Sequence, residues 1–436
     1  MTLSRSAELH RRAKRSLPGG NTRTTVFMQP HPIYAARGEG CRLIDVDGNS
    51  YIDCINNFTA LIHGYGHPGI TQAVMGQLAL GTCFGAPTES EIELAELLAS
   101  RVGSVEQLRF CNSGTEAVMF ALKAARAFTG RPKIAKCEGA YHGTYDYAEV
   151  SLDSKPETWG ANWPRSIAYA RGTPEGVLTD VVTIPFNDPV AAAELIRAHG
   201  KELAAVLVDP MPNRAGLIPA TPAFIQALRE STKATGSLLI FDEVIVFRLG
   251  HGGAQPFWNA EADLTTFGKI MGGGFPVGAV GGRREVMAVF DPSNGKPALP
   301  HGGTFSANPV TMHAGIAAMK LLDEAAFRHL DRLGEAVRGG IDQSFRRHGL
   351  PGATTGKGSL LKVHFTDRPV RDYRSALPRP EEAARLDGFF RALLDRGVLI
   401  APNGLFALST PMGDREVEHI VEACDSAIAS VMVAPA

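Results

Sequence analysis

Between about residues 90 and 290, short apolar runs alternate with helical patterns, and this alternation limits the possible folds more than any other feature. The runs at 203–209 and 238–242 each read as a buried strand, and a helical pattern over 222–234 separates them. Strands joined through helices in this way run parallel, with helices covering the faces of the sheet. The sequence therefore predicts an α/β fold built on a mainly parallel sheet.

The two ends of the chain have a different pattern. Residues 1–16 predict a basic helix, and Asp47-Gly48-Asn49 between two apolar runs predicts a hairpin. A long connecting helix is predicted over 307–325, and amphipathic helices follow it with short strands near 358–365 and 398–401. We therefore expect a small α+β domain around a large one, divided into an N-terminal segment of the small domain at 1–60, a large domain at 61–325 and a C-terminal part of the small domain at 326–436.

Charge and composition exclude several classes of protein. The chain has 44 Lys and Arg against 45 Asp and Glu, so it lacks the basic excess of a general nucleic-acid or acidic-membrane binder. No run of about 20 apolar residues predicts a membrane span, and the N-terminus lacks the apolar core of a secretory signal. Six cysteines without CxxC pairs, and 13 histidines without an HExxH motif, predict reduced thiols and no metal site. We expect a cytoplasmic protein.

Open α/β sheets bind ligands at the carboxyl ends of their strands, so reactive residues there are informative. The first such segment, Asn112–Glu116, follows a predicted strand and begins a helix at 114–129. A helix N-terminus offers free N–H groups and a positive dipole end, which suits a phosphate group. An ordinary capped helix is the alternative for this motif.

Two further predicted strand ends carry residues that can take part in chemistry, Asp242 and Lys269. Asp242 closes the apolar run LLIFD, and a carboxylate there is either paired with a cation, such as a metal or a protonated ring nitrogen, or exposed in a loop. Lys269 stands alone in FGKIMGGGFPVG, where desolvation would lower the pKa of the amine and suit a Schiff-base lysine; a surface lysine is the alternative. Tyr141 and His142 lie in a Gly-flanked turn, where an aromatic ring can stack on a planar ligand.

These parts match the needs of one cofactor. Pyridoxal 5'-phosphate requires a Schiff-base lysine, a carboxylate at its pyridine nitrogen and a site for its phosphate. Lys269, Asp242 and the turn at Asn112–Glu116 could supply these three functions. The sequence therefore predicts a pyridoxal-phosphate enzyme.

The chain also resembles a known family over nearly its whole length: the class III aminotransferases of fold type I. Within them it is most similar to the branch of glutamate-1-semialdehyde aminomutase and the β-amino-acid (β-phenylalanine) aminotransferases. The resemblance rests on motifs in the same order, namely PGGNTRT (18–24), ARGEGCRLIDVDGNSYID (36–53), GTCFGAP (81–87), RFCNSGTEAVMFALKAARAFTGRPKI (109–134), EGAYHG (138–143), FDEV (241–244), DLTTFGKIMGGGFPVGAVGG (263–282) and GTFSANP (303–309). It implies a seven-stranded sheet in the large domain.

The resemblance also implies roles for individual residues. Lys269 would form the Schiff base and move the substrate proton, and Asp242 would pair with the pyridine nitrogen. The other residues expected at the cofactor are Ser113, Gly114 and Thr115 at its phosphate, Tyr141 and Val244 on the two ring faces, His142 beside Tyr141, and Thr304, which would reach the phosphate of the neighbouring subunit. A shared site of this kind implies a homodimer.

The substrate side departs from the aminomutase pattern. Arg23 aligns with the arginine that binds the substrate carboxylate in this branch, and Phe58 replaces the aminomutase tryptophan. The acidic residue expected near Asn403 is missing, and the mobile lid is replaced by residues 151–166. The residues expected to shape the substrate pocket are Arg23, Phe58, Trp163, Arg248 and Asn403.

Three functions follow, in order of preference. The first is an aminotransferase that moves an amino group from an amino acid or β-amino acid to a 2-oxo acid by a ping-pong mechanism. The second is an isomerase, either glutamate-1-semialdehyde 2,1-aminomutase or an amino-acid racemase; the missing acidic residue near Asn403 disfavours the aminomutase. The third is a non-catalytic pyridoxal-phosphate protein, which the intact Lys269 and Asp242 disfavour.

Overall fold

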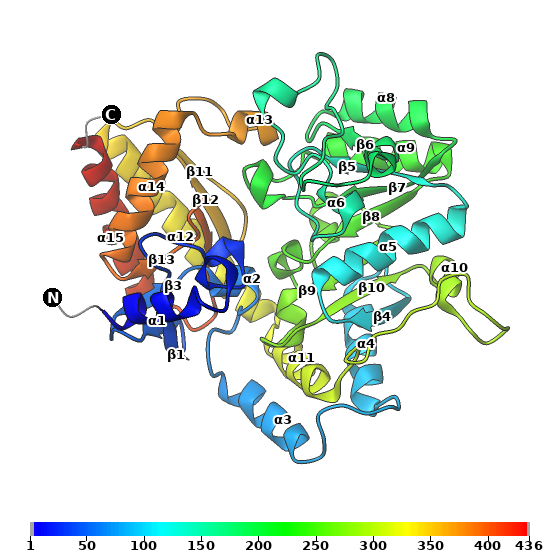
Figure 1. Ribbon diagram of the computed structural model, residues 1–436, viewed down its shortest axis with the longest axis horizontal. Helices are drawn as coiled ribbons and strands as arrows, with labels where there is room; N and C mark the ends of the chain where they lie inside the picture. The colour runs from blue at the N-terminus through cyan, green and yellow to red at the C-terminus, as the bar shows by residue number, and fades with distance from the viewer. Residues whose placement is uncertain (1–3, 434–436) are drawn as a thin grey trace.

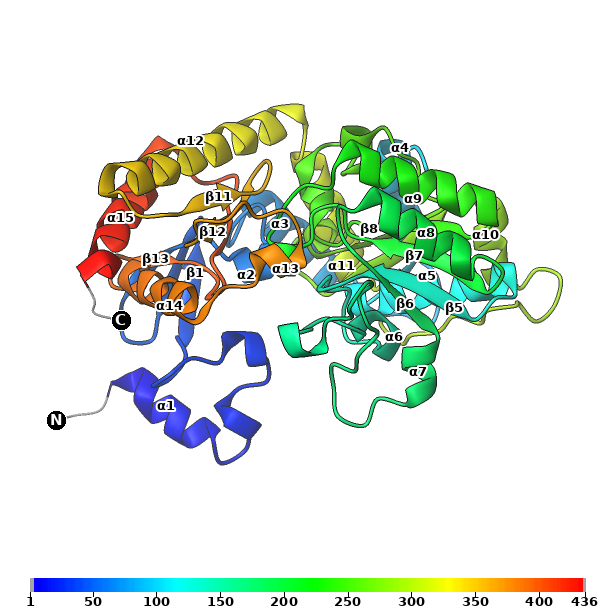
Figure 2. The same cartoon turned by 90° about the horizontal axis from the view of Figure 1, so that it is seen from above.

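The computed structural model describes residues 4–433, which form two lobes side by side (Figure 1). The large lobe holds the long central sheet, and the small lobe holds both ends of the described chain (Figure 2). No helix within residues 4–433 combines the length and the apolar character needed to cross a bilayer.

The large lobe is built on a seven-stranded sheet that confirms the predicted fold class. The strand order is β4 (Gln107–Cys111), β10 (Gly278–Gly282), β9 (Leu264–Gly268), β8 (Leu238–Asp242), β7 (Leu203–Val208), β5 (Lys133–Cys137) and β6 (Val181–Ile184). Strand β10 runs antiparallel to both of its neighbours, β4 and β9, and all other neighbouring strands of this sheet are parallel. Strands β7, β8 and β9 are buried along their whole length, as expected for strands covered on both faces.

Alternate residues of these strands face two different helical layers. Leu207 and Ile240 pack with α5 (Gly114–Thr129) on one face. Val206 and Leu239 pack with α8 (Pro189–His199) and α9 (Pro222–Thr235) on the other. Successive side chains of a strand point to opposite faces of the sheet, and here both faces are apolar and covered by helices. The large lobe therefore has three layers, with the sheet between two layers of helices.

The small lobe combines segments from both chain ends. Its four-stranded sheet has the order β1 (Ala35–Glu39), β2 (Arg42–Asp45), β3 (Ser50–Asp53) and β13 (Val398–Leu399), and its three-stranded sheet has the order β11 (Ala353–Thr355), β12 (Leu360–His364) and β14 (Leu405–Ala407). Helices α12 (Glu324–His348), α14 (Pro380–Leu394) and α15 (Asp414–Val433) pack on them. The antiparallel pairing of β2 with β3 confirms the predicted hairpin. The boundaries 1–60, 61–325 and 326–436 stay predictions.

The predicted terminal and connecting helices are shorter than expected. The basic helix of 1–16 is α1 (Arg5–Ala13), and residues 1–3 of that prediction lie outside the described part. The connecting helix of 307–325 is α11 (Pro309–Leu321), because Asn308 caps its first turn and Asp323 starts α12. The remaining helices are α2 (Asn56–Thr59), α3 (Pro68–Leu78), α4 (Glu89–Arg101), α6 (Asp146–Glu149), α7 (Glu175–Thr179), α10 (Arg284–Met287) and α13 (Tyr373–Ala376).

Candidate active site

The ends of β4, β8 and β9 meet at a pocket of about 380 Å³. The pocket collects most of the residues expected from the sequence, which are Arg23, Phe58, Ser113, Gly114, Thr115, Tyr141, His142, Asp242, Val244 and Lys269. These residues come from segments far apart in the chain, so the strand ends of the sheet bring them together.

The N-terminus of α5 forms one end of this pocket. Ser113 caps the helix, because its Oγ accepts from the Glu116 N–H at 3.2 Å. The Glu116 carboxylate accepts from the N–H of Asn112 and not from that of Ser113, so the helix is capped without the reciprocal bond of a capping box. The N–H groups at the start of the helix therefore remain available to an anion, as the first N–H groups of a helix have no partner within it.

Two glycines allow neighbouring segments to pack closely at the N-terminus of α5. A Cβ on Gly143, whose φ is +87°, would lie 2.5 Å from the Thr115 Oγ1. A Cβ on Gly114 would lie 2.8 Å from a methyl carbon of Val244. Since Thr115 Oγ1 also accepts from the Thr144 N–H at 3.3 Å, the turn after His142 is joined to the first turn of α5.

Asp242 is held in a fixed orientation at the end of β8. Its Oδ1 accepts from the Val244 N–H and from the Thr266 Oγ1, both at 3.0 Å, and its Oδ2 lies 2.7 Å from His142 Nδ1. Burial lowers the pKa of His142 and so favours its neutral ring, whose Nδ1–H then donates to the carboxylate. A buried carboxylate with three donors can point one oxygen at a cationic ring nitrogen without moving.

The neighbouring carboxylate, Glu243, has a different role. It is fully buried, and its oxygens accept from the Ala254 N–H at 2.7 Å and the Gln255 Nε2 at 2.9 Å. Side chains alternate along a strand, so Asp242 faces the pocket while Glu243 anchors the segment that follows. Burial raises the pKa of Glu243 to about 7.

Lys269 follows β9 and lines the pocket with Asp242. Its backbone has a φ of +50°, which is unusual for a lysine and marks a tight turn out of the strand. Burial lowers the pKa of the Lys269 amine, while Asp242 and Asp209 act in the opposite direction. An amine in such a position gains a larger neutral, nucleophilic fraction.

Asp209 is a pocket residue that the site prediction omitted. It follows β7, lines the pocket, and accepts from the Met211 N–H at 2.9 Å. Burial and the negative charge of Asp242 raise the pKa of Asp209 well above its usual value. Its place directly after an apolar strand is the same signal that identified Asp242, so the sequence contained the information needed to find it.

The substrate side of the pocket is formed by a left-handed turn. Asn56, Asn57, Phe58 and Thr59 have φ values of +51°, +48°, +55° and +75° in succession, although none is glycine. Such residues cost energy and persist where their surroundings hold them. The Asp53 Oδ1 accepts from the N–H groups of Ile55 and Asn56, at 2.7 and 2.9 Å, and so holds the turn.

This turn positions Arg23. The Arg23 Nη1 donates to Asn57 Oδ1 at 2.8 Å, and its guanidinium carbon lies 5.7 Å from the centre of the Phe58 ring. An adjoining cavity of about 430 Å³ shares Arg23, Asn57 and Phe58 with the pocket. Apolar side chains line much of it, including Val26, Phe27, Met28, Ile33, Leu43 and Phe390.

Four residues expected at the site do not line this pocket. Arg248 is a correction: it is fully buried, and each of its three side-chain nitrogens donates elsewhere, to Ser359 Oγ and to the carbonyl groups of Thr59 and Leu408. Asn403 lines a different cavity, between the lobes. Trp163 and Thr304 are both exposed, and neither is among the residues that line the pocket in the single chain.

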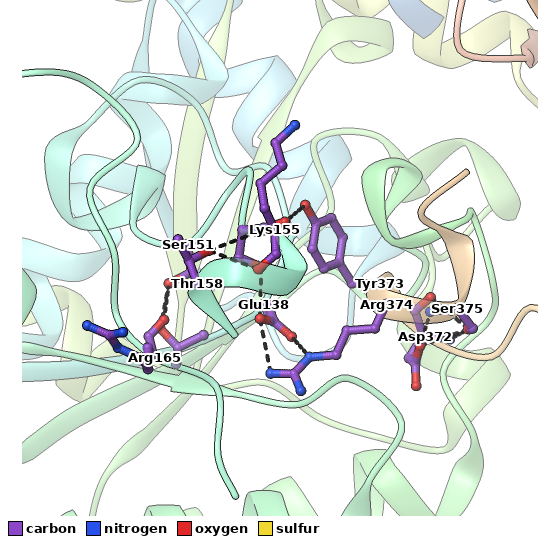
Figure 3. Close-up of polar contacts among 11 residues, drawn as sticks. Glu138, Ser151, Lys155, Thr158, Arg165, Asp372, Tyr373, Arg374 and Ser375 are labelled. Carbon is purple, nitrogen blue, oxygen red and sulfur yellow. Dashed lines mark hydrogen bonds and ion pairs between the residues drawn. The ribbon is translucent and has the colours of Figure 1, made fainter. Parts of the chain in front are cut away.

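The segment 151–166 is tied to the small lobe by a polar network (Figure 3). The Arg374 Nε of α13 donates to Glu138 Oε2 at 2.7 Å, and Ser154 Oγ donates to Glu138 Oε1 at 2.8 Å. Tyr373 donates from its hydroxyl to the Ser154 carbonyl at 2.8 Å. Since Glu138 lies three residues before Tyr141, α13 supports the turn that carries Tyr141 and His142.

The arrangement fits pyridoxal phosphate. One pocket is lined by the N-terminus of α5, which suits an anion, by the fixed carboxylate of Asp242 and by the partly buried amine of Lys269. His142 Nε2 is a buried polar atom without a partner among residues 4–433. A mainly parallel seven-stranded sheet carrying these groups at its strand ends defines a fold type I pyridoxal-phosphate enzyme.

Comparison with known proteins gives the family. The model of the class-III aminotransferases matches residues 25–428, and the chain belongs to this family. It is 42% identical over 97% of its length to a glutamate-1-semialdehyde 2,1-aminomutase of Methanothermobacter thermautotrophicus, of which it covers 98%.

Two solved structures are also similar. An omega-transaminase from Sphaerobacter thermophilus is 53% identical with a TM-score of 0.97, over 98% of each chain. A β-phenylalanine aminotransferase from Variovorax paradoxus is 37% identical with a TM-score of 0.87, over 98% of this chain and 94% of that one.

These relatives confirm part of the sequence-based prediction. The cofactor is pyridoxal 5'-phosphate, and the protein is a class III pyridoxal-phosphate enzyme. The names of the curated relatives favour the isomerase alternative over the aminotransferase prediction, while transaminases are among the similar structures. When bound, the cofactor withdraws electrons from the substrate carbon that bears the amino group.

Proposed function

We propose that this protein is an aminotransferase that moves an amino group from an apolar amino acid or β-amino acid to a 2-oxo acid by a ping-pong mechanism. The observation that supports it most is the placement of Arg23 between the pocket of Lys269 and the apolar cavity of about 430 Å³. A guanidinium suits a carboxylate, and the cavity suits an apolar side chain. The omega-transaminase and the β-phenylalanine aminotransferase support the same function by similarity.

Each pocket residue has a part in this proposal. Lys269 would bind the cofactor covalently and move the proton at the reacting carbon of the substrate, since burial lowers its pKa and so increases the neutral fraction of the amine. Asp242, oriented by His142, holds the proton on the ring nitrogen. Tyr141 and Val244 hold the ring, and Ser113, Gly114 and Thr115 hold the phosphate.

A cytoplasmic homodimer belongs to the same proposal. Large apolar side chains are exposed along α3, α4, the segment that joins these two helices, and the segment between α10 and α11, namely Met75, Leu78, Leu80, Phe84, Ile92 and Phe305. Exposed apolar groups of this extent favour a protein interface. Thr304 lies next to Phe305, so a second copy seated there would lie against Thr304, the residue that the resemblance to the class III family implies would reach that copy's cofactor phosphate.

The curated relatives favour a second candidate, an aminomutase acting on glutamate 1-semialdehyde. The resemblance favours the aminotransferase over it, since the acidic residue of the aminomutase is absent near Asn403, which here lines the cavity between the lobes. The isomerase alternative also includes an amino-acid racemase.

A single set of half-reactions separates these candidates. The holoenzyme is mixed with both enantiomers of α- and β-phenylalanine, without a keto acid, and the cofactor spectrum is recorded. An aminotransferase converts to the pyridoxamine form and turns over only after pyruvate or 2-oxoglutarate is added. Isomerisation of glutamate 1-semialdehyde, or racemisation of an amino acid, without any keto acid would contradict the proposal.

The Lys269→Ala variant tests the enzyme class. It should lose the absorption band of the lysine-bound cofactor and about 10²–10⁴-fold in rate. The exposed Lys201 gives a matched control, Lys201→Ala, which should retain both. Unchanged activity in Lys269→Ala would contradict the assignment of Lys269.

A further inference from the structure

A separate cavity of about 240 Å³ lies where the two lobes meet. The large lobe contributes Asp153 and Arg214, and the small lobe contributes Lys362, His364, Arg368 and Tyr373. Tyr373 belongs to α13, which lies between the lobes (Figure 1). The Tyr373 hydroxyl joins α13 to the 151–166 segment by its hydrogen bond to the Ser154 carbonyl. The cavity therefore has charged walls from both lobes.

Lys362 is directed to this cavity by the alternation of β12. Leu361 and Val363 enter the apolar core of the small lobe, so Lys362 and His364 face the large lobe. The Lys362 Nζ donates to the Asn213 carbonyl at 2.9 Å, and His364 Nε2 lies 3.1 Å from the Gly216 carbonyl. Lys362 is only 8% exposed, although lysine is rarely buried without a charged partner.

The other charges around the cavity are paired to different degrees. Arg368 donates two hydrogen bonds to Glu382, at 3.0 and 2.9 Å, and is satisfied. Arg214 makes a single contact of 3.2 Å with Asp153.

Lys362 forms no ion pair with any carboxylate in the described part of the chain, and one carbonyl occupies one of its three N–H donors. Burial, with the charge of Arg214 nearby, lowers the pKa of Lys362 to about 7.

We propose that this cavity binds a small oxyanion, a carboxylate or phosphate group, between the Lys362 ammonium and the Arg214 guanidinium. Guanidinium and ammonium donors match such oxygens, and a buried cation without a counterion is costly. A volume of about 240 Å³ admits a group of several heavy atoms, since one water occupies about 30 Å³. Because Lys362 and Arg214 come from different lobes, the bound anion links them.

The test measures binding, so its result is independent of the proposed catalytic function. Inorganic phosphate and glutarate are titrated separately into the holoenzyme by calorimetry, at constant ionic strength set with chloride. The Arg23→Gln background is used, so that the neighbouring pocket does not take up the carboxylate. We expect saturable binding of at least one anion, and the stronger binder identifies phosphate or carboxylate as the favoured group.

Three variants assign the binding to this cavity. Lys362→Met should weaken it at least tenfold. Arg214→Gln, at a partly exposed position, should also weaken it and serves if Lys362→Met does not fold. The exposed Lys201→Met should leave the affinity unchanged. Absence of saturable binding of both anions, or binding undiminished in Lys362→Met and Arg214→Gln, would overturn the proposal.

Discussion

His142 Nδ1 donates to Asp242 Oδ2 at 2.7 Å, and this contact joins the turn after β5 to the end of β8. His142 is buried, and Asp242 is 4% exposed, so the contact lies in a site screened from water. It fixes one carboxylate oxygen while the Val244 N–H and Thr266 fix the other. His142 is therefore a positioning residue for Asp242.

Replacing His142 should weaken cofactor binding. Hydrogen bonds to charged groups contribute about 1.5–3 kcal/mol, so His142→Phe should raise the dissociation constant of pyridoxal phosphate about 10–100-fold and shift the cofactor absorption band. His142→Asn retains a donor and should recover part of the loss. Equilibrium dialysis with the absorption spectrum measures both, and equal affinities for His142→Phe and the unchanged protein would contradict the role.

Arg23 should determine recognition of the substrate carboxylate. Arg23→Gln removes a charge-assisted contact, so KM for an amino-acid donor should rise about 10–100-fold. An amine donor that lacks the carboxylate should be little affected. Arg37→Gln, an exposed arginine of β1, is the matched control. Equal losses for the amino acid and the amine would show that Arg23 acts on the fold and not on the carboxylate.

Glu138 and Arg374 should be energetically coupled across the lobes. The Glu138 side chain is 3% exposed and that of Arg374 is 33% exposed, so removing Arg374 leaves a buried carboxylate with only Ser154. A double-mutant cycle of Glu138→Gln and Arg374→Met should give a coupling of about 1–3 kcal/mol in thermal or denaturant unfolding of the holoenzyme. Additive effects of the two substitutions would contradict this coupling.

Lys362 should make stability depend on pH above neutrality. Folding lowers the pKa of Lys362 from 10.5 to about 7. Between pH 7 and pH 10.5, the unfolded chain therefore binds a proton on this amine that the folded protein does not bind. The stability gained from the neutral amine is complete above pH 10.5 and is lost as the pH falls towards 7.

In buffer without phosphate or carboxylate, the melting temperature of Lys362→Met minus that of the unchanged protein should fall between pH 7 and 10. The other charged groups facing the cavity, Asp153, Arg214, His364, Arg368 and Glu382, are common to both proteins. A difference that does not vary with pH would contradict the lowered pKa.

Local sequence signals located the cofactor side of the pocket. Each of three residues lies at a strand end or at a helix start, namely Ser113, Asp242 and Lys269. Such positions can be predicted from the sequence, because a run of apolar residues marks a buried strand and the polar residue after the run marks its end. Asp209 had the same signal and was still omitted from the site prediction. The roles of these residues stay predictions, but the structure places all four in one pocket.

The positions of the residues expected on the substrate side could not be predicted from such local sequence signals. Arg248 follows the segment of Asp242 by only a few residues, yet its partners are Ser359 and the carbonyl groups of Thr59 and Leu408. No sequence pattern predicts that a charged residue will be fully buried by groups more than a hundred positions away. The left-handed turn at Asn56–Thr59 depends partly on a distant contact, because Asp53 holds it locally while the Ala407 carbonyl accepts from the Asn56 side chain.

The sequence by itself determined the alternation of buried strands and helices, and hence a parallel sheet with a lysine, a carboxylate and an anion cradle at its edge. Those features depend on periodicity and on neighbours in the chain. Only the tertiary structure decided that Arg23 lies against Asn57, that Arg248 is buried in the interior, and that Lys362 faces Arg214 across the lobes. These contacts join residues distant in sequence, and their energies depend on burial and pairing that exist only once the chain is folded.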